Sequence, residues 1–465
     1  TYYETIHFHG KNIHLQSLDP LDPVTVATTI IDANHQDSVA TFDGTETSDC
    51  LLAGFTLRNG SAPYGGAING NDCRATVRKN VIRNNLGSLS GGGICGCDGT
   101  IEGNVIQDNH SNEGGGLFDC DGLVRFNRIM RNSADDSQLP ISYEGRGGGL
   151  AECGGNIVGN IVARNTTDGA GGGAESVGSL YYNTFYQNSG SPGLSVNDSG
   201  SLYGNIFWEP SGYPLSDTSP PHYCILSHLP ILEEKDGNLG TDPRMVNPAG
   251  GDFRLQPNSP AIDAGVSYSA IDFDLEGNPR PYDATDRPRG DGSDLDIGAV
   301  EFIGQAQPNP LPHRPVNLSP EDGETVFGFN PILVSPPMVD DDPSDIHTWT
   351  EWQVDNQPNI DPDNLVVGWL SDEEDLLQIT VVDEGQYLPA DTTFWWRIRH
   401  RDNYAGWSEW SVPTSFSTRG SGTLNVPQDF VTIQGALDVS TPGDVILISP
   451  GTYNESLVIR VADIT

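Results

Sequence analysis

Three charged residues recur at one position of a repeated segment, and their types could support acid–base chemistry. Asp108, Arg131 and Arg164 each stand directly before an asparagine, and they are separated by 23 and 33 residues. A carboxylate and an arginine at one site could act together in general acid–base catalysis. A solvent-facing ladder of ion pairs explains the same column without any reaction. We favour the ladder, so we assign no catalytic residue and keep these three as the candidates.

Aspartates crowd together in two places where they could hold a cation. The first is DATDRPRGDGSDLD at 283–296, where Asp291, Asp294 and Asp296 are the predicted ligands. Oxygen-rich loops with glycine turns suit Ca²⁺ better than a transition metal. Each place also fits a solvated acidic turn, so Ca²⁺ is the cofactor that we expect if the chain takes one. The second cluster comprises Asp340, Asp341, Asp342 and Asp345.

An internal repeat predicts the elements that position these residues. Short strands that recur every 22–25 residues between glycine clusters are typical of a parallel β-helix, in which equivalent residues stack about 4.8 Å apart. The stacked asparagines could then bond the coils above and below. Segments of the form N-x-[IVF] begin at Asn80, Asn104, Asn127, Asn160, Asn183 and Asn205.

Two further features follow the same period. The longest step contains an insertion, SADDSQLPISYEGR at 133–146, which is either a binding loop or a tolerated surface insertion. Cys73, Cys97, Cys120 and Cys153 form another column. Because stacked side chains point in parallel, we expect buried thiols there rather than disulfides.

The repeated segments resemble a known superfamily. FTLRNG at 55–60, with the GGG clusters and the N-x-[IVF] segments, resembles right-handed parallel β-helix proteins of the pectate-lyase-like superfamily. Three later blocks resemble the C-terminal part of secreted bacterial β-helix proteins with a choice-of-anchor Q domain. These blocks are DFRLQPNSPAIDAG (252–265), DFDLEGNPRP (272–281) and DIGAVEF (296–302). The resemblance covers about residues 1–304 and implies a secreted protein, extracellular or at the cell surface.

The same resemblance gives no specific enzymatic activity. The combined Asn-Thr-Asp, Asp-Asp and Arg-Ile-Lys signatures of polygalacturonase-like hydrolases are absent, and so is the Arg-x-Pro-x-x-Arg pattern of pectate lyases. Related enzymes without these signatures exist, so the absence weakens the enzyme hypothesis without closing it.

A different kind of domain follows the Pro-rich linker. Alternating apolar residues, as in TFWWRIRHRD at 393–402, predict an antiparallel sandwich. VNLSPEDGETV, this strand and TSFST together resemble a fibronectin type III domain. The motif WSEWS at 407–411 resembles that of cytokine-receptor sandwiches. We interpret it as a cation–π ladder with Arg397, Arg399 and Arg401 that stiffens the sandwich, rather than as a ligand site.

The last segment resembles the N-terminal cap of another β-helix. It reads LNVPQDFVTIQGALDVSTPGDVILISPGTYNESLVIR (424–460), with a short helix expected at about 431–439. TYYETIHFHGKNIH at the start of the sequence matches TYNESLVIRVADIT at its end, so that Glu4 corresponds to Glu455. We therefore expect either tandem repeats or copies joined head to tail, with an arbitrary fragment as the alternative. The predicted interface residues are Tyr3, Ile6, Phe8, Ile13, Val445, Leu447, Leu457 and Ile459.

Composition limits the partners. The net charge of −41 disfavours nucleic acid, because an acidic surface repels phosphate. It also disfavours a direct contact with acidic polysaccharide unless cations bridge the two. The sequence has no run of about 18 apolar residues, so we expect no membrane span. The expected partners are the chain itself or adjacent repeats of the same polypeptide, with a polysaccharide as a further candidate.

Together these patterns predict an all-β protein: a right-handed parallel β-helix, a fibronectin III-like sandwich and a capping segment with one short helix. Its predicted function is that of an extracellular structural or adhesive surface protein. The alternatives are a polysaccharide lyase or glycoside hydrolase acting in a groove of the β-helix, and a non-catalytic carbohydrate-binding module; we lean against an enzyme. The predicted domains are the coils at 1–210, their C-terminal region at 211–304, a linker at 305–312, the sandwich at 313–418 and the cap with first rungs at 419–465.

Overall fold

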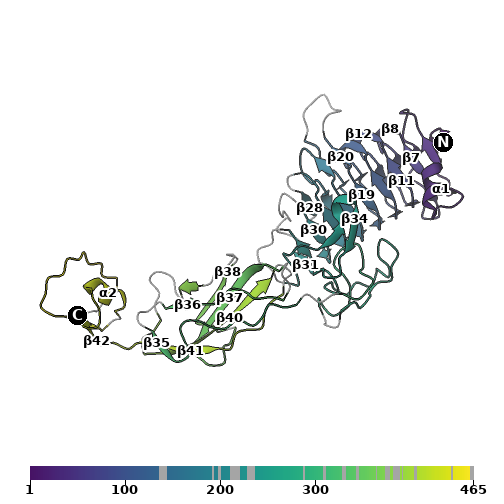
Figure 1. Cartoon of the computed structure of the whole chain (residues 1–465). Coiled ribbons are helices and arrows are strands. Elements are labelled where there is room, and N and C mark those ends of the chain that lie inside the picture. The colour runs from purple at the N-terminus through teal and green to yellow at the C-terminus, as the bar shows by residue number, and fades with distance from the viewer. Residues whose placement is uncertain are drawn as a thin grey trace. The chain divides into compact units, whose positions relative to one another are not determined.

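The computed structural model divides the chain into two compact units, residues 1–308 and 309–465 (Figure 1). The division falls inside the expected linker. Within the part of the chain that the structure describes, no helix is long and apolar enough to cross a membrane. The description omits residues 136–143, 191–192, 197–199, 210–219, 228–235, 286–288, 307–309, 327–330, 342–344, 363, 372–377, 381–387, 390, 403–405, 441–442 and 461–465.

The first unit is the parallel β-helix that the repeat predicts. Its strands stack coil on coil into long parallel sheets. The ten-stranded sheet has the order β1 (Tyr2–Tyr3), β4 (Ile30–Asp32), β7 (Thr56–Arg58), β11 (Val81–Arg83), β15 (Val105–Gln107), β19 (Arg128–Met130), β23 (Ile161–Ala163), β27 (Thr184–Tyr186), β30 (Ile206–Trp208) and β32 (Ile225–Leu226).

Two further sheets complete each coil. The nine-stranded sheet runs β3 (His14–Gln16), β6 (Leu51–Ala53), β10 (Thr76–Arg78), β14 (Thr100–Glu102), β18 (Leu123–Arg125), β22 (Asn156–Val158), β26 (Ser179–Tyr181), β29 (Leu202–Tyr203) and β31 (Pro221–His222). The eight-stranded sheet runs β2 (Ile6–His7), β5 (Ala40–Thr41), β9 (Ile68–Cys73), β13 (Ile94–Cys97), β17 (Leu117–Phe118), β21 (Leu150–Ala151), β25 (Ala174–Val177) and β28 (Leu194–Val196).

Smaller elements fill the bends. A five-stranded sheet runs β24 (Thr166–Thr167), β20 (Ser133–Ala134), β16 (His110–Glu113), β12 (Leu86–Ser90) and β8 (Ser61–Tyr64). The helix α1 (Pro23–Thr28) interrupts the first coil, and the sequence analysis did not anticipate it. It begins there because the Asp22 side chain accepts hydrogen bonds from the backbone of Val24 and Thr25, and because proline suits the first helical turn.

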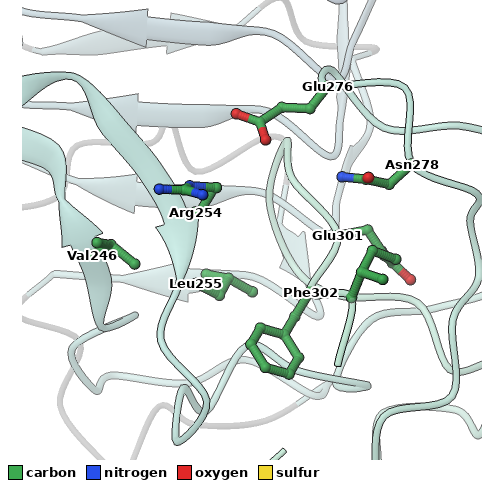
Figure 2. A pocket seen from close by; sticks show the side chains of 8 residues that line it. Val246, Arg254, Leu255, Glu276, Asn278, Glu301 and Phe302 are labelled. Carbon is green, nitrogen blue, oxygen red and sulfur yellow. The ribbon is translucent and has the colours of Figure 1, made fainter. Parts of the chain in front are cut away.

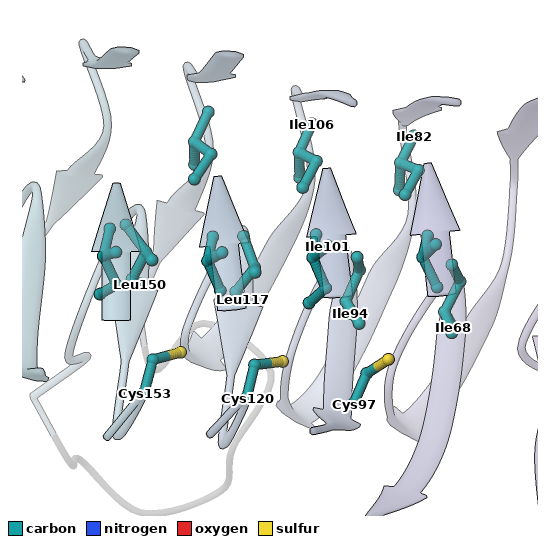
Figure 3. Packing of buried hydrophobic residues seen from close by; sticks show 14 of the residues in the cluster. Ile68, Ile82, Ile94, Cys97, Ile101, Ile106, Leu117, Cys120, Leu150 and Cys153 are labelled. Atoms are coloured by element: carbon teal, nitrogen blue, oxygen red, sulfur yellow. The ribbon is translucent and has the colours of Figure 1, made fainter. Parts of the chain in front are cut away.

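Like residues stack on like residues inside the solenoid (Figure 3). Ile82 pairs with Ile106, and Ile106 with Ile129, in one register along the ten-stranded sheet. All seven cysteines are buried and free, which confirms the prediction for the cysteine column. Even Cys73 and Cys97, on neighbouring coils, keep their sulfur atoms 3.9 Å apart.

Two buried asparagine ladders tie the coils together. The backbone N–H of Asn104 donates to Oδ1 of Asn127 at 2.8 Å, and its Nδ2 donates to the Val77 carbonyl at 2.8 Å. Each asparagine thus serves the coil on either side of its own, as the sequence predicts. The first ladder comprises Asn80, Asn104, Asn127, Asn160, Asn183 and Asn205, and the second Asn85, Asn109, Asn132, Asn165 and Asn188.

A glutamate ends the second ladder. The Glu209 carboxylate accepts the backbone N–H and the Nδ2 of Asn188 at 2.6 and 2.7 Å. Burial raises the pKa of Glu209 to about 7, although the two bonds from Asn188 act in the opposite direction. This ladder therefore ends on a group that can titrate near neutral pH.

Residues 240–306 pack against the outer face of the ten-stranded sheet. This segment contains β33 (Met245–Asn247), the short helix η2 (Pro248–Gly250) and β34 (Asp252–Leu255), and its apolar residues join those of β23, β27 and β30. A fully buried ion pair holds it in place, with Arg280 Nε 2.7 Å from Glu301 Oε2. The Arg280 guanidinium also lies 4.5 Å from the ring centre of Tyr182.

The second unit contains a mainly antiparallel core, in which only β35 and β41 pair in parallel among the described strands of its five-stranded sheet, and a small capping element. Trp352 and Trp396 are buried and stack with their ring centres 6.0 Å apart. Its resemblance to a fibronectin type III domain stays a prediction. The five-stranded sheet runs β35 (Glu324–Val326), β41 (Thr414–Thr418), β40 (Thr393–Asp402), β37 (His347–Asp355) and β38 (Val367–Ser371), and β36 (Ile332–Val334) pairs with β39 (Gln378–Thr380). The capping element consists of β42 (Thr423–Val426), α2 (Ile433–Asp438) and β43 (Val445–Ile448).

Replacing a central ladder residue should destabilise the β-helix strongly. Asn132→Ala removes the acceptor of both Asn109 donors and the donor to the Ile106 carbonyl, all in the interior. We expect a loss of roughly 2–4 kcal/mol in the free energy of unfolding, measured by urea denaturation. The control is Asn156→Ala on the exposed side of β22, which should change stability by less than about 0.5 kcal/mol. Equal effects of the two substitutions would contradict the structural role of the ladder.

Glu209 should make stability depend on pH. Since its pKa is higher in the folded state (about 7) than the ordinary value of 4.5, folding takes up a proton between these limits. The contribution is therefore full below about pH 4.5 and is lost as the pH rises through about 7, by roughly 3 kcal/mol in total. The difference in unfolding free energy between the natural chain and Glu209→Gln should shift by this amount between pH 4.5 and 8. A difference that does not change with pH would refute the assignment.

Candidate functional site

The three candidate catalytic residues, Asp108, Arg131 and Arg164, all bind other groups of the protein. Arg131 donates to both carboxylate oxygens of Asp108, at 2.9 and 3.1 Å, and both side chains lie at the surface. The hydrogen bonds that Arg131 donates to this carboxylate raise the pKa of Arg131. Arg164 instead donates to the carbonyl of Pro248 at 3.2 Å and to that of Ala249, and so holds η2. All three backbones have φ between 54° and 56°, which marks a tight turn that recurs in each coil.

A second charged column lies along the eight-stranded sheet, beside the insertion. Arg146 Nη1 is 3.7 Å from a Glu152 oxygen and 3.8 Å from a Glu175 oxygen, and its Nε is 3.9 Å from Glu113. Partial burial and the neighbouring Glu175 raise the pKa of Glu152, although Arg146 acts in the opposite direction. Most of the insertion, residues 136–143, lies outside the described residues, so the choice between a binding loop and a tolerated surface insertion stays open.

The first aspartate cluster points its members in different directions. Asp291 accepts the backbone N–H and the hydroxyl of Ser267, each at 2.8 Å. Asp294 is half-buried, and partial burial and then the nearby Asp283 raise its pKa. Asp296 is fully buried and accepts the backbone N–H of Asp263 at 2.8 Å. Asp286 lies outside the described residues.

The second cluster converges more closely. Among the described residues, oxygens of Asp340, Asp345 and the buried Asp402 all lie within 4.8 Å of one another. Asp402 was not part of the sequence prediction, and Asp342 lies outside the described residues. Carboxylates at this spacing suit a hard cation, and calcium binding stays a prediction for both clusters.

The WSEWS motif forms the predicted ladder. The Arg399 guanidinium lies 4.3 Å from the ring centre of Trp407 and 4.5 Å from that of Trp410. Arg397 lies 4.3 Å from Trp410, and Arg401 lies 5.8 Å from Trp407. Arginine and tryptophan side chains alternate along this ladder, so that each guanidinium group lies over an indole ring. These cation–π contacts stiffen the sandwich.

The predicted interface residues of the first coil are mostly accessible. Tyr3 is 73% exposed and Ile13 is 47% exposed, while Ile6 is half-buried. Phe8 differs from the other three because it is buried and stacks on Phe42, with ring centres 4.2 Å apart. The outer edges of β1 and β2 make no ladder contact among the described strands.

The capping element exposes a second apolar surface. Leu447 is 53% exposed, Leu457 is 47% exposed and Ile459 is 65% exposed, whereas Val445 is half-buried. On the other side of the element, Ala436 of α2 is buried against Leu424 and Val426 of β42. The element is therefore amphipathic, with one covered face and one open face.

A groove of about 340 Å³ lies on the β-helix unit where the later sequence blocks meet (Figure 2). Arg254 and Leu255 of β34 line one side, and Glu276, Asn278 and Phe302 line the other. The sequence analysis did not find it, because these residues come from three separate segments. The available signal was the resemblance of the three blocks to one C-terminal region.

Comparisons with known proteins add little to this description. No known protein family matches the chain, and no curated protein matches it. Two solved structures share a small part of the fold: the α-L-rhamnosidase of Streptomyces avermitilis in complex with L-rhamnose, and the α-L-rhamnosidase of Dictyoglumus thermophilum. They are 20% and 21% identical over 23% of this chain, which spans 10% and 12% of their own lengths, and both TM-scores are 0.19. Likeness at this level carries no argument about function.

If the Asp108–Arg131 pair is an exposed ion pair, its removal should have little effect. Arg131→Gln should change the unfolding free energy by less than about 1 kcal/mol, because exposed pairs contribute little. Urea denaturation measures this, and Asp108→Asn should give a similar value. Both variants should leave any glycan-cleaving activity unchanged. Loss of such an activity in both variants would restore the catalytic hypothesis.

Proposed function

We propose that the chain is an extracellular structural unit whose β-helix elements stack end to end. In this arrangement the capping element at 423–460 covers the first coil, residues 1–16, of another unit. That unit is a second copy of the chain or an adjacent repeat of the same polypeptide. The observation that carries the proposal is the construction of the capping element, which repeats the geometry of the coils it would cover.

The strand register supports this geometry. Thr423 of β42 pairs in parallel with Val445 of β43, 22 residues later, and the pairing continues to Val426 and Ile448. This offset equals the shorter steps of the coils in the first unit. β42 and β43 are therefore stacked in the manner of two successive rungs, with α2 on one side.

A specific contact within the element indicates how the next coil would fit. The Glu455 carboxylate accepts the backbone N–H groups of Ile433 and Gln434 at 3.0 and 2.9 Å, at the start of α2. Glu4 occupies the corresponding position of the first coil, and its side chain is exposed. Residues 1–9 match residues 452–460 in sequence, so Glu4 of a neighbouring unit could accept these two bonds only by taking the place of Glu455.

Apolar burial would supply the energy of association. Tyr3 and Ile13 at the first coil, and Leu447 and Ile459 at the capping element, expose large apolar side chains. Covering such surfaces stabilises an interface by roughly 25 cal/mol per Å² of apolar area. The net charge of −41 would keep a long assembly soluble, which fits a secreted or cell-surface setting.

The polysaccharide lyase or glycoside hydrolase alternative has less support. Asp108 and Arg131 pair with each other, and Arg164 is bound to loop carbonyls, so the described column offers no unpaired base.

End-to-end stacking predicts concentration-dependent association. Sedimentation of the purified chain should show species larger than 49.9 kDa as concentration rises, and electron microscopy of native material should show a regular axial repeat. Leu447→Asp and Glu4→Gln should each weaken association by at least about tenfold, because one charges the apolar face and the other removes the capping carboxylate.

Two controls accompany this experiment. Val412→Asp charges an equally exposed apolar residue of the sandwich, and Asp49→Asn removes an exposed carboxylate outside the first coil. Neither should alter association. A single 49.9 kDa species in native material, at every concentration, would refute both the tandem and the head-to-tail forms of the proposal.

A further inference from the structure

We propose that the groove between β34 and the 274–278 turn binds a neutral sugar. This site lies on the β-helix unit and uses none of the end surfaces described above. It is therefore independent of the stacking proposal, and either can fail without the other.

The polar groups of the rim are held in place by neighbours that lie outside the groove. Asp274, which is buried, accepts the backbone N–H of Asn278 at 2.7 Å and its Nδ2 at 2.9 Å. Glu276 is 3.3 Å from Arg128 of β19. Arg254 donates from Nε and Nη2 to Asp252 at 2.8 and 2.6 Å. Side chains fixed in this way lose little freedom when a ligand binds.

These groups still offer hydrogen bonds to a ligand. Nη1 of Arg254 and Oδ1 of Asn278 enter no bond with the described residues, and the Glu276 carboxylate keeps a second oxygen beyond its contact with Arg128. Figure 2 shows the Glu276 carboxylate and the Asn278 amide extending toward the side that carries Arg254. A donor, an acceptor and an amide that can do both match hydroxyl groups, which also donate and accept.

Apolar side chains stand among the polar ones in both walls of the groove. Val246, which is 47% exposed, and the buried Leu255 lie on the side of Arg254, and the half-buried Phe302 lies on the side of Glu276. A pyranose ring has C–H groups on its faces and hydroxyls around its edge, so it can contact Val246 and Phe302 and still reach the rim. The volume of about 340 Å³ lies at the lower end of the roughly 300–1,000 Å³ typical of small-molecule sites.

The charges of the groove favour a ligand without charge. Arg128 pairs with Glu276, and Arg254 pairs with Asp252, so these four charges cancel. Glu301, the further carboxylate in the lining, is paired with the buried Arg280. An anionic ligand would also face the field of a chain with a net charge of −41. A neutral sugar meets neither penalty.

Titration of the full chain with sugars tests the proposal. Glucose, galactose, mannose and N-acetylglucosamine, from about 0.1 to about 50 mM, bracket the millimolar affinity of a small open site. Saturation-transfer NMR and calorimetry should show saturable binding of at least one of them. Glu276→Gln and Arg254→Gln, both at the surface, should each weaken this binding by at least about fivefold.

The matched control is Glu102→Gln. Glu102 forms a similar pair with Arg125 at 3.2 Å on the nine-stranded sheet, away from the groove, and its replacement should leave sugar binding unchanged. Thermal unfolding should show that all three variants fold. The proposal is overturned if no neutral sugar binds, if galacturonate binds better than every neutral sugar, or if binding persists in both groove variants.

Discussion

The rest of the β-helix depends on the buried asparagine ladders. An asparagine side chain that serves the backbone of the coils around it can do so only if successive coils remain in one register. A slip of one residue would leave amide groups unpaired in the interior, at a cost of about 1–3 kcal/mol each. By fixing the register of the coils, the ladders also determine which side chains stack above one another on the outer surface. This is why Asp108 and Arg131, on neighbouring coils, meet in a two-bond ion pair.

The sequence predicts a feature well where the feature follows from a regular pattern. The ladders and the cysteine column follow the period of the coils, and the strand at 393–402 follows from alternating apolar residues. The structure has all three where they were expected. It was insufficient where a contact joins distant segments. Arg164 binds carbonyls 84 and 85 residues away, and the groove collects residues from β34, the 274–278 turn and Phe302. No periodic pattern carries such contacts, because they depend on how the 240–306 segment folds back onto the sheet.

The aspartate clusters also show that spacing in the sequence does not predict which side chains meet in the structure. Spacing alone placed Asp291, Asp294 and Asp296 together as ligands, yet their surroundings assign them different environments. Asp296 turns into the core beside the buried Arg280–Glu301 pair, and burial and then Glu301 hold its pKa well above the usual value. Asp291 faces Ser267 at the surface. Carboxylates that are close in sequence can thus face different surroundings, whereas Asp402, at the end of β40, lies close to Asp340 although the two are 62 residues apart in the sequence.

At each end of a ladder, the last asparagine has no asparagine on one side, so another group must bond with it. At one end of the second ladder, Glu209 replaces asparagine and supplies two acceptors for the two donors of Asn188. The first ladder ends on Cys224, whose sulfur is 3.4 Å from the Asn205 nitrogen. At the other end, Asn80 and Asn85 accept backbone N–H groups of Phe55 and Gly60. The coil that precedes them has Phe55 and Gly60 at these positions, and its strand β7 continues the sheet through its pairing with β4. Since strand edges and exposed apolar side chains are the features that other chains can cover, the proposed stacking would depend on the outer edge of β1 and on the exposed apolar residues of the capping element.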